Sequence, residues 1–177
     1  LALSTQGGLS LATILRPFFK VTPEARGYFS IGKNKQLTFA GRVKAGTLLA
    51  PGNNTPIVVR YFSGGASMRG FQQRRLSPQI AVATLEKDPT CLGQTVCPNI
   101  GTTLPVGGSG LFEASAEIRW AFAENWVLAV FNDWGLVTAT PLSPSQNWAE
   151  HLYTALGFGV RYRTPLGPVR LDLAFRM

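Results

Sequence analysis

Few residues in this sequence have side chains that could form a reactive or metal-binding site. The chain has two cysteines, Cys91 and Cys97, and one histidine, His151. A structural zinc site takes four nitrogen, sulfur or oxygen ligands, so we expect no metal and no cofactor. The two cysteines lie close together in the sequence, which favours a short-loop disulfide formed in an oxidising compartment over two unpaired thiols.

A catalytic nucleophile is equally hard to find. The Gly-x-Ser-x-Gly elbow of lipase-like hydrolases is absent from the sequence. The nearest segment, Gly107-Gly108-Ser109-Gly110, is explained by a transition from a loop into a strand. His151 is expected in an external loop, without the partners of a catalytic triad. We therefore predict that the chain is not an enzyme.

The composition indicates a chain whose surface does not lie mostly in water. The 177 residues are 45% hydrophobic and 15% charged, and the charged fraction is below the roughly 25% of average soluble domains. The formal net charge of +8 would suit nucleic-acid binding. The basic residues are scattered, however, with no basic helix and no basic-aromatic motif, so we expect no nucleic-acid partner.

The hydrophobic pattern argues against membrane-spanning helices. No stretch approaches the roughly 18 consecutive apolar residues that such a helix needs. A membrane protein without these helices must cross as a closed β-barrel, because every backbone polar group has to be paired inside the bilayer. A soluble β-sandwich is the alternative that composition leaves open.

Apolar and polar residues alternate along the chain, as they do in strands with two different faces. In segment 111–122, Ile118 and Trp120 share an apolar face, whereas Glu113 and Glu117 share the polar one. Similar alternation covers residues 25–31, 36–49, 126–136, 152–163 and 169–176. With a further strand over residues 9–19, the sequence predicts an all-β chain of about seven antiparallel strands.

The predicted strands are joined by connectors of two kinds. The short ones are residues 32–35, 123–125 and 164–167, and the long ones are 50–108 and 138–150. Outer-membrane barrels have short periplasmic turns and long external loops. We therefore treat residues 1–177 as one partial transmembrane barrel domain, with an external or lumenal loop at 50–108 and an external loop at 138–150.

Large aromatic residues stand on the apolar face of these strands. Trp120, Phe122 and Trp126 flank one short turn, and Trp134 lies farther along the same face. This pattern is typical of the aromatic girdle at a membrane interface, with core tryptophans of a soluble sandwich as the alternative. Glycines inside strands, such as Gly46, would permit bends or the close approach of a segment inside the barrel.

The long connector carries the most specific pattern in the chain. It reads Arg60-Tyr-Phe-Ser-Gly-Gly-Ala-Ser-Met-Arg-Gly-Phe71 and continues to Leu76-Ser77-Pro78. This resembles the loop signature of the BamA/TamA-like family of outer-membrane insertase and translocase barrels, the superfamily of surface antigens and two-partner secretion transporters. The matching residues are Gly64, Gly65, Met68, Arg69, Gly70 and Phe71, with Met68 where valine or isoleucine is usual.

The resemblance implies a place for the arginine of this loop. In the family the loop folds back into the barrel lumen, and its arginine contacts acidic residues of the inner wall. Asp133 and Glu117 stand at matching positions, and both lie on the polar faces given by the alternation. We predict that Arg69 pairs with Asp133, with Glu117 adjacent, because a planar guanidinium suits a carboxylate.

The resemblance also implies a larger assembly. Family barrels have sixteen strands and are preceded by periplasmic POTRA domains, so this chain would be the C-terminal part of such a barrel. About seven strands cannot close it, since bacterial single-chain barrels have an even number of at least eight. No signal peptide is visible, and we expect the remaining strands and domains to be absent from this sequence or supplied by other chains.

The leading hypothesis is an outer-membrane barrel that inserts or exports proteins without chemical catalysis. Its expected partners are outer-membrane lipids, client outer-membrane or secreted proteins, upstream POTRA domains and accessory subunits. One alternative is a passive channel whose basic inner faces favour anions, although a simple porin lacks the Arg-Gly-Phe loop. The other is a barrel that anchors a missing upstream domain, such as a lipase-like enzyme.

Overall fold

The described part of the chain is built almost entirely of strands. The computed structural model describes residues 2–10, 16–32, 36–51, 55–86, 97–143, 152–165 and 167–177. The strands are β1 (Ala2–Ser10), β2 (Arg16–Ile31), β3 (Leu37–Leu49), β4 (Gln79–Glu86), β5 (Cys97–Pro105), β6 (Gly110–Ala121), β7 (Trp126–Thr138), β8 (Tyr153–Thr164) and β9 (Gly167–Arg176). A 3-10 turn, η2 (Ile57–Val59), follows β3. In these ranges no helix is long and apolar enough to cross a membrane.

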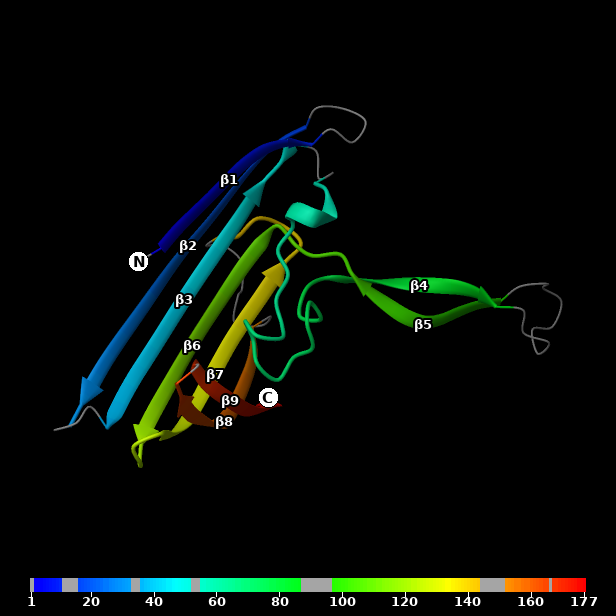
Figure 1. Cartoon of the computed structure of the whole chain (residues 1–177). Coiled ribbons are helices and arrows are strands. Elements are labelled where there is room, and N and C mark those ends of the chain that lie inside the picture. The colour runs from blue at the N-terminus through cyan, green and yellow to red at the C-terminus, as the bar shows by residue number, and fades with distance from the viewer. Residues whose placement is uncertain are drawn as a thin grey trace.

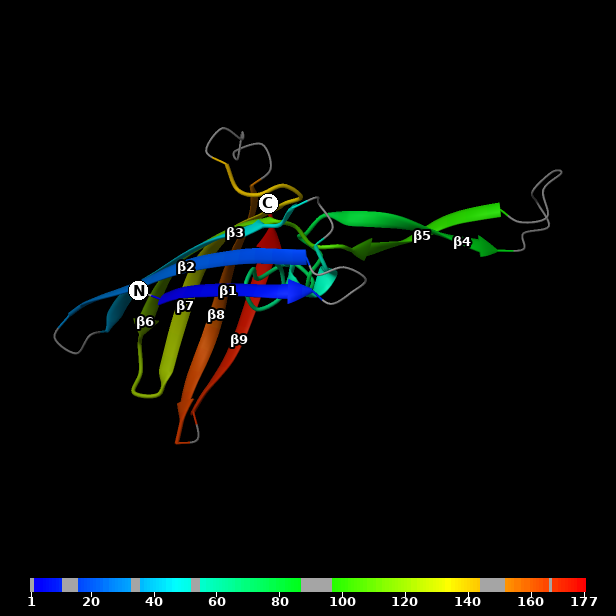
Figure 2. The ribbon, with the colours of Figure 1, turned by 90° about the horizontal axis from the view of Figure 1, so that it is seen from above.

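Seven of the described strands form one antiparallel sheet, and the other two form a separate hairpin. The order in the large sheet is β1-β2-β3-β6-β7-β8-β9, and β4 pairs with β5. Figure 1 shows the β4–β5 hairpin projecting away from the sheet. Figure 2 shows that the sheet curves and that the segment before β4 lies over its concave side. A curved, antiparallel, up-and-down sheet has the form of a barrel wall.

The two faces of this sheet have opposite chemical character. On β6 the residues that point away from the concave side are apolar, and Ile118 and Trp120 are 46% and 52% exposed. The carboxylates on the concave side, Glu113 and Glu117, are only 1% and 8% exposed. A sheet in water would bury its apolar face and expose its charges. Apolar residues outside and charged residues inside are instead typical of strands surrounded by lipid.

The prediction of one strand over residues 9–19 was wrong. In the structure β1 ends at Ser10 and β2 begins at Arg16, and the two strands pair with Leu9 opposite Pro17. The segment therefore belongs to a hairpin. Pro17 is the second residue of β2, near a strand end, where the missing N–H group of a proline is tolerated.

The long connector between β3 and β6 contains two strands that the alternation pattern does not predict. β4 and β5 pair from Gln79 opposite Pro105 to Glu86 opposite Cys97, with an irregularity after Val82. The all-β fold is nevertheless confirmed, and the large sheet has seven strands in the described ranges. Its first two strands differ from the predicted ones, because β2 extends the predicted strand 25–31 back to Arg16, and β1 lies mostly before the predicted strands.

Candidate functional site

Residues 55–78, here called the inner loop, pack against the concave face of the sheet. Their contact is an apolar cluster in which the loop contributes Tyr61, Met68 and Leu76, and the strands contribute Leu48, Leu111, Val137 and Ala155. Met68 is completely buried. Gly135 of β7 makes room for it, because a Cβ atom there would lie 3.1 Å from Met68 Sδ. The loop is therefore part of the core of the described structure.

Glycines give the tip of the inner loop its tight path. Gly64 has φ +119°, and a Cβ atom at this position would lie 2.2 Å from the carbonyl oxygen of Gln72. The N–H of Gly65 donates to the carbonyl of Phe71 at 2.8 Å, which closes the tip. Gly70, with φ +86°, approaches Ala155 on the wall. Glycine adopts such conformations with little strain, so these glycines permit the tight path that brings Arg69 to the wall.

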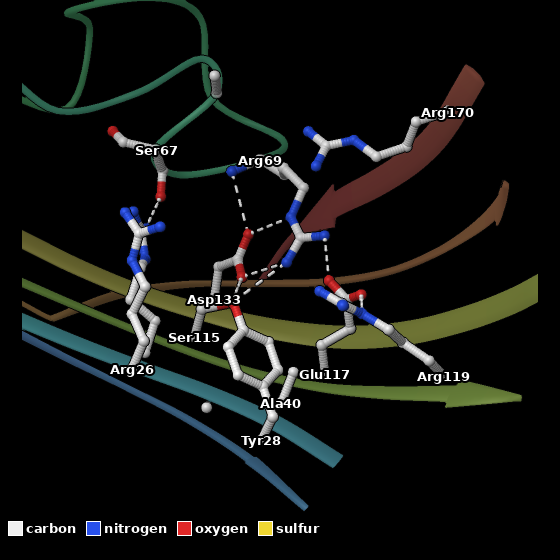
Figure 3. Close-up of a pocket in the computed structure, with 13 residues that line it drawn as sticks. Arg26, Tyr28, Ala40, Ser67, Arg69, Ser115, Glu117, Arg119, Asp133 and Arg170 are labelled. Atoms are coloured by element: carbon white, nitrogen blue, oxygen red, sulfur yellow. Dashed lines mark hydrogen bonds and ion pairs between the residues drawn. The ribbon is translucent and has the colours of Figure 1, made fainter. Parts of the chain in front are cut away.

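Arg69 is held by two strands of the wall (Figure 3). Its Nε and Nη2 donate to the two carboxylate oxygens of Asp133 at 2.7 and 2.8 Å. Nη1 donates to Glu117 at 3.0 Å, and Nη2 also reaches Ser115 Oγ at 3.2 Å. The guanidinium carbon lies 3.3 Å from the ring centroid of Phe131. The structure thus brings together Arg69, Asp133 and Glu117, the three residues that the loop signature singled out.

Further charges extend this site along the wall. Asp172 of β9 lies 3.5 Å from Arg69 Nη1. Glu117 also accepts a hydrogen bond of 2.6 Å from Arg119 and contacts Arg161. The arginine of the loop is therefore one member of a network of ion pairs that crosses β6, β7, β8 and β9.

The surroundings of Arg69 keep it charged. Burial acts to lower the pKa of Arg69, but hydrogen bonds and charge from Asp133 and Glu117 outweigh burial, and the pKa is raised above its ordinary value. Charge-assisted bidentate pairs of this kind are among the strongest hydrogen bonds in proteins. Chemically, the arrangement holds a loop in place. In the described ranges no three His, Cys, Asp or Glu side chains are grouped to hold a metal ion.

A second polar contact attaches the inner loop to β6. Ser63 Oγ donates to Glu113 at 2.6 Å, and Glu113 is almost completely buried. The other oxygen of this carboxylate lies 3.8 Å from Arg42 and 3.8 Å from Lys44. Arg42 in turn donates to the carbonyl oxygen of Ser67 at 2.7 Å. Glu113 therefore offsets part of the positive charge of Arg42 and Lys44 on β3 and binds the loop at the same time.

A third contact, made by Tyr61, attaches the base of the loop to β2 and β3. The Tyr61 hydroxyl donates to the carbonyl of Val21 at 2.8 Å and lies 2.8 Å from Thr22 Oγ1. Its ring rests on Gly46, where a Cβ atom would lie 2.6 Å from Cζ. Burial raises the pKa of Tyr61, and the hydrogen bond with Thr22 offsets part of that effect. The close approach expected at Gly46 is thus made by a loop tyrosine.

The remaining predicted residues lie away from Arg69. Phe71 packs edge-on against Tyr153, with ring centroids 5.8 Å apart. The outward face carries the predicted interface aromatics: Trp120, Phe122 and Trp126 lie near one turn and are exposed, and Trp134 is half-buried. Cys97 begins β5, but Cys91 lies outside the described residues, so the disulfide stays a prediction.

Several members of the site were not predicted from the sequence, among them Ser63, Glu113, Tyr61 and Asp172. Glu113 lies on the polar face of β6 together with Glu117. Because a buried carboxylate needs a partner, this position in the alternation could have indicated that Glu113 belongs to the site. Gly46 was a weaker signal, because a glycine inside a strand indicates close approach without naming the approaching residue.

Comparison with known proteins agrees with this geometry. The chain matches the Omp85 superfamily domain over residues 6–177. It is 26% identical, over 160 residues, to the outer membrane protein assembly factor BamA of Nitratidesulfovibrio vulgaris, covering 89% of this chain and 18% of that protein. The chain thus spans under a fifth of the length of this relative.

A solved structure shows the same fold. The crystal structure of BamA from Haemophilus ducreyi lacking POTRA domains 1–3 matches with a TM-score of 0.67 and 17% sequence identity, and the match covers 99% of this chain and 35% of that one. At this identity the likeness concerns the fold, and it identifies the curved sheet as part of a barrel wall. Since the family match extends over nearly all of the sequence, the chain belongs to the Omp85 superfamily.

Proposed function

We propose that this chain is part of an outer-membrane barrel that inserts proteins into that membrane or moves them across it. The observation that carries the proposal is the inner loop, which Arg69 attaches to Asp133 and Glu117 on the concave face. In this role the loop is a strut that holds the wall in shape. The activity requires no chemical step and no catalytic group.

The apolar outward face supports a position in the bilayer. Its exposed residues include Ile118, Trp120, Val130 and Phe158, and such a band is what lipid tails accept. In outer-membrane barrels the short turns face the periplasm and the long loops face outside. On this basis the β6–β7 and β8–β9 turns would be periplasmic, and the β4–β5 hairpin external.

The proposed partners follow from the relatives. The similar protein of N. vulgaris is an assembly factor for outer membrane proteins, so the clients of this chain would be unfolded barrel or secreted proteins. POTRA domains, of which the H. ducreyi structure lacks the first three, and accessory subunits would act with it.

The test uses the full-length protein that carries this chain, reconstituted in lipid vesicles. An unfolded outer-membrane barrel protein is added, and its conversion to a protease-protected form is followed over time. The wild-type protein is expected to accelerate conversion, and Arg69→Ala to slow it several-fold, because Asp133 then loses its buried partner. Arg26→Ala is the matched control, since Arg26 is an exposed arginine of the concave face paired with its neighbour Glu24. Equal conversion in vesicles with and without the protein would contradict the proposal.

A further inference from the structure

A second cavity lies on the concave face, at the end of the sheet that carries the short turns, and it shares Arg119 and Arg170 with the pocket around Arg69. Its volume is about 480 Å³, which is within the range of roughly 300–1,000 Å³ of small-ligand sites. The described residues that line it include Arg119, Arg161, Arg163 and Arg170, and no aspartate or glutamate is among them. The cavity wall is therefore strongly cationic.

The strand register forces two of these arginines together. Arg161 of β8 lies directly opposite Arg170 of β9. Like charges at directly opposed positions of an antiparallel pair destabilise it. An anion between the two side chains would turn this repulsion into attraction.

The carboxylates near the cavity are already shared. Arg119 and Arg161 both contact Glu117, and Arg170 lies 3.2 Å from Asp172. Both carboxylates also contact Arg69 of the inner loop. Arg163 has no ion pair with any described residue. The described residues around the cavity and Arg69 carry three carboxylates, those of Glu117, Asp133 and Asp172. They carry five guanidinium groups, those of Arg69, Arg119, Arg161, Arg163 and Arg170, which leaves an excess of two positive charges.

Arg161 supplies the second observation. Its side chain is only 12% exposed, yet its Nε and Nη2 have no hydrogen-bond partner among the described residues. Nη2 approaches Glu117 without the alignment of a hydrogen bond. Buried polar groups are nearly always hydrogen-bonded, and leaving one unpaired costs free energy. Both oxygens of the buried Asp172 carboxylate also lack a hydrogen-bond partner among the described residues. A further carboxylate in the cavity would give the Arg161 donors an acceptor of their own.

We propose that this cavity binds a carboxylate of an acidic polypeptide segment through Arg161, Arg163 and Arg170. A guanidinium group pairs with a carboxylate in two parallel hydrogen bonds. The apolar part of the lining, Ala121, Val127 and Pro168, suits the methylene groups of glutamate. The arginines that line the cavity belong to the polar, concave face of the sheet and not to the apolar outward face, which favours a polypeptide over a lipid headgroup. That the ligand is a polypeptide rests on the proposed function.

The test measures binding of a fluorescent polyglutamate peptide to the full-length protein in detergent micelles. A polyglutamine peptide of equal length is the control ligand. Arg163→Gln and Arg170→Gln are each expected to weaken polyglutamate binding about fivefold, whereas Arg163→Lys keeps the charge and recovers part of the loss. Arg26→Gln, outside the cavity, is the matched control and should change nothing. Added salt should weaken binding as well.

Three outcomes would overturn the inference. The first is equal binding of polyglutamate and polyglutamine, and the second is binding unaffected by both cavity variants. The third is displacement of the peptide by micromolar inorganic phosphate, which would make this a phosphate site. The same protein samples are also assayed for insertion of a client in vesicles. If the wild-type protein inserts the client normally but does not bind polyglutamate, the cavity proposal alone is refuted. If the wild-type protein binds polyglutamate but does not insert the client, the proposed function alone is refuted.

Discussion

The carboxylate of Asp133 binds both the side chain and the backbone N–H of Arg69. The carboxylate accepts Nε and Nη2 of the guanidinium at 2.7 and 2.8 Å, and it also accepts the backbone N–H of Arg69 at 3.2 Å. Ser115 Oγ donates to the same carboxylate at 2.6 Å, which holds it in the orientation that the loop requires. Asp133 of β7 thus fixes the position of the loop tip.

Ser63→Ala is expected to destabilise the protein by about 1–3 kcal/mol, because it removes the hydroxyl that Glu113 accepts and leaves a buried carboxylate with one partner fewer. Urea unfolding of the full-length protein in micelles, followed by tryptophan fluorescence, measures the change. Ser67→Ala is the control, since Ser67 Oγ makes only a local bond of 3.3 Å to Gly64. Equal effects of the two substitutions would show that the contact with Glu113 does not stabilise the loop.

Gly46→Ala is expected to cost about 1–3 kcal/mol, because the new methyl group overlaps the ring of Tyr61. Gly41→Ala, in the same strand, meets nothing within 4 Å and should be close to neutral. In a Tyr61→Ala background, Gly46→Ala should carry no further penalty. If the penalty is the same with and without the tyrosine ring, the proposed packing of Tyr61 on Gly46 is wrong.

Tyr61 should ionise at higher pH than an ordinary tyrosine, whose pKa is 10.0, because burial raises its pKa. The neutral hydroxyl is the form that the folded protein prefers. Its contribution to stability is therefore complete below pH 10.0 and is lost as the pH rises through the raised pKa. A titration of tyrosinate absorbance, compared between wild-type and Tyr61→Phe protein, isolates this group. A Tyr61 component at or below the ordinary value would contradict the buried position.

Val130→Arg is expected to destabilise the membrane-embedded protein by roughly 2–4 kcal/mol, since Val130 lies on the outward face within β7. Val58→Arg should have little effect, because Val58 belongs to η2 in the inner loop and is 89% exposed. Unfolding of both variants in lipid vesicles measures the difference. If Val130→Arg destabilises the protein no more than Val58→Arg does, the outward face lies in water.

Much of the barrel wall could be predicted from sequence, because lipid on one side and charge on the other impose a strict alternation. The alternation alone distinguishes the two faces of β6 and β7, and it puts Glu117 and Asp133 on the polar face, which is the concave one. The loop signature adds Arg69. Neither signal depends on the path of the loop backbone.

The elements that were not predicted from the sequence lack this contrast between an apolar and a polar face. β4 and β5 project from the wall, so their sequence shows no lipid-facing period. The sequence predicts one strand over residues 9–19 and misses the pairing of β1 with β2. Residues 11–15 are Leu-Ala-Thr-Ile-Leu, and this stretch contains none of the usual turn residues. The contacts of Ser63 and Tyr61 depend on where the glycine-rich tip directs the loop. That path follows from positive φ angles, which the sequence allows but does not specify.

The most direct test of the strut is a double-mutant cycle on Arg69 and Asp133 in the full-length protein. Unfolding free energies are measured in micelles for Arg69→Ala, Asp133→Ala and the double variant. Each single substitution should cost about 3–5 kcal/mol, because it leaves a buried charge without its main partner. The double variant should cost little more than the worse single one, which gives a coupling energy close to the smaller single penalty, roughly 3–4 kcal/mol. Penalties that simply add would show that the two residues do not interact, and the central claim that this pair anchors the inner loop would be wrong.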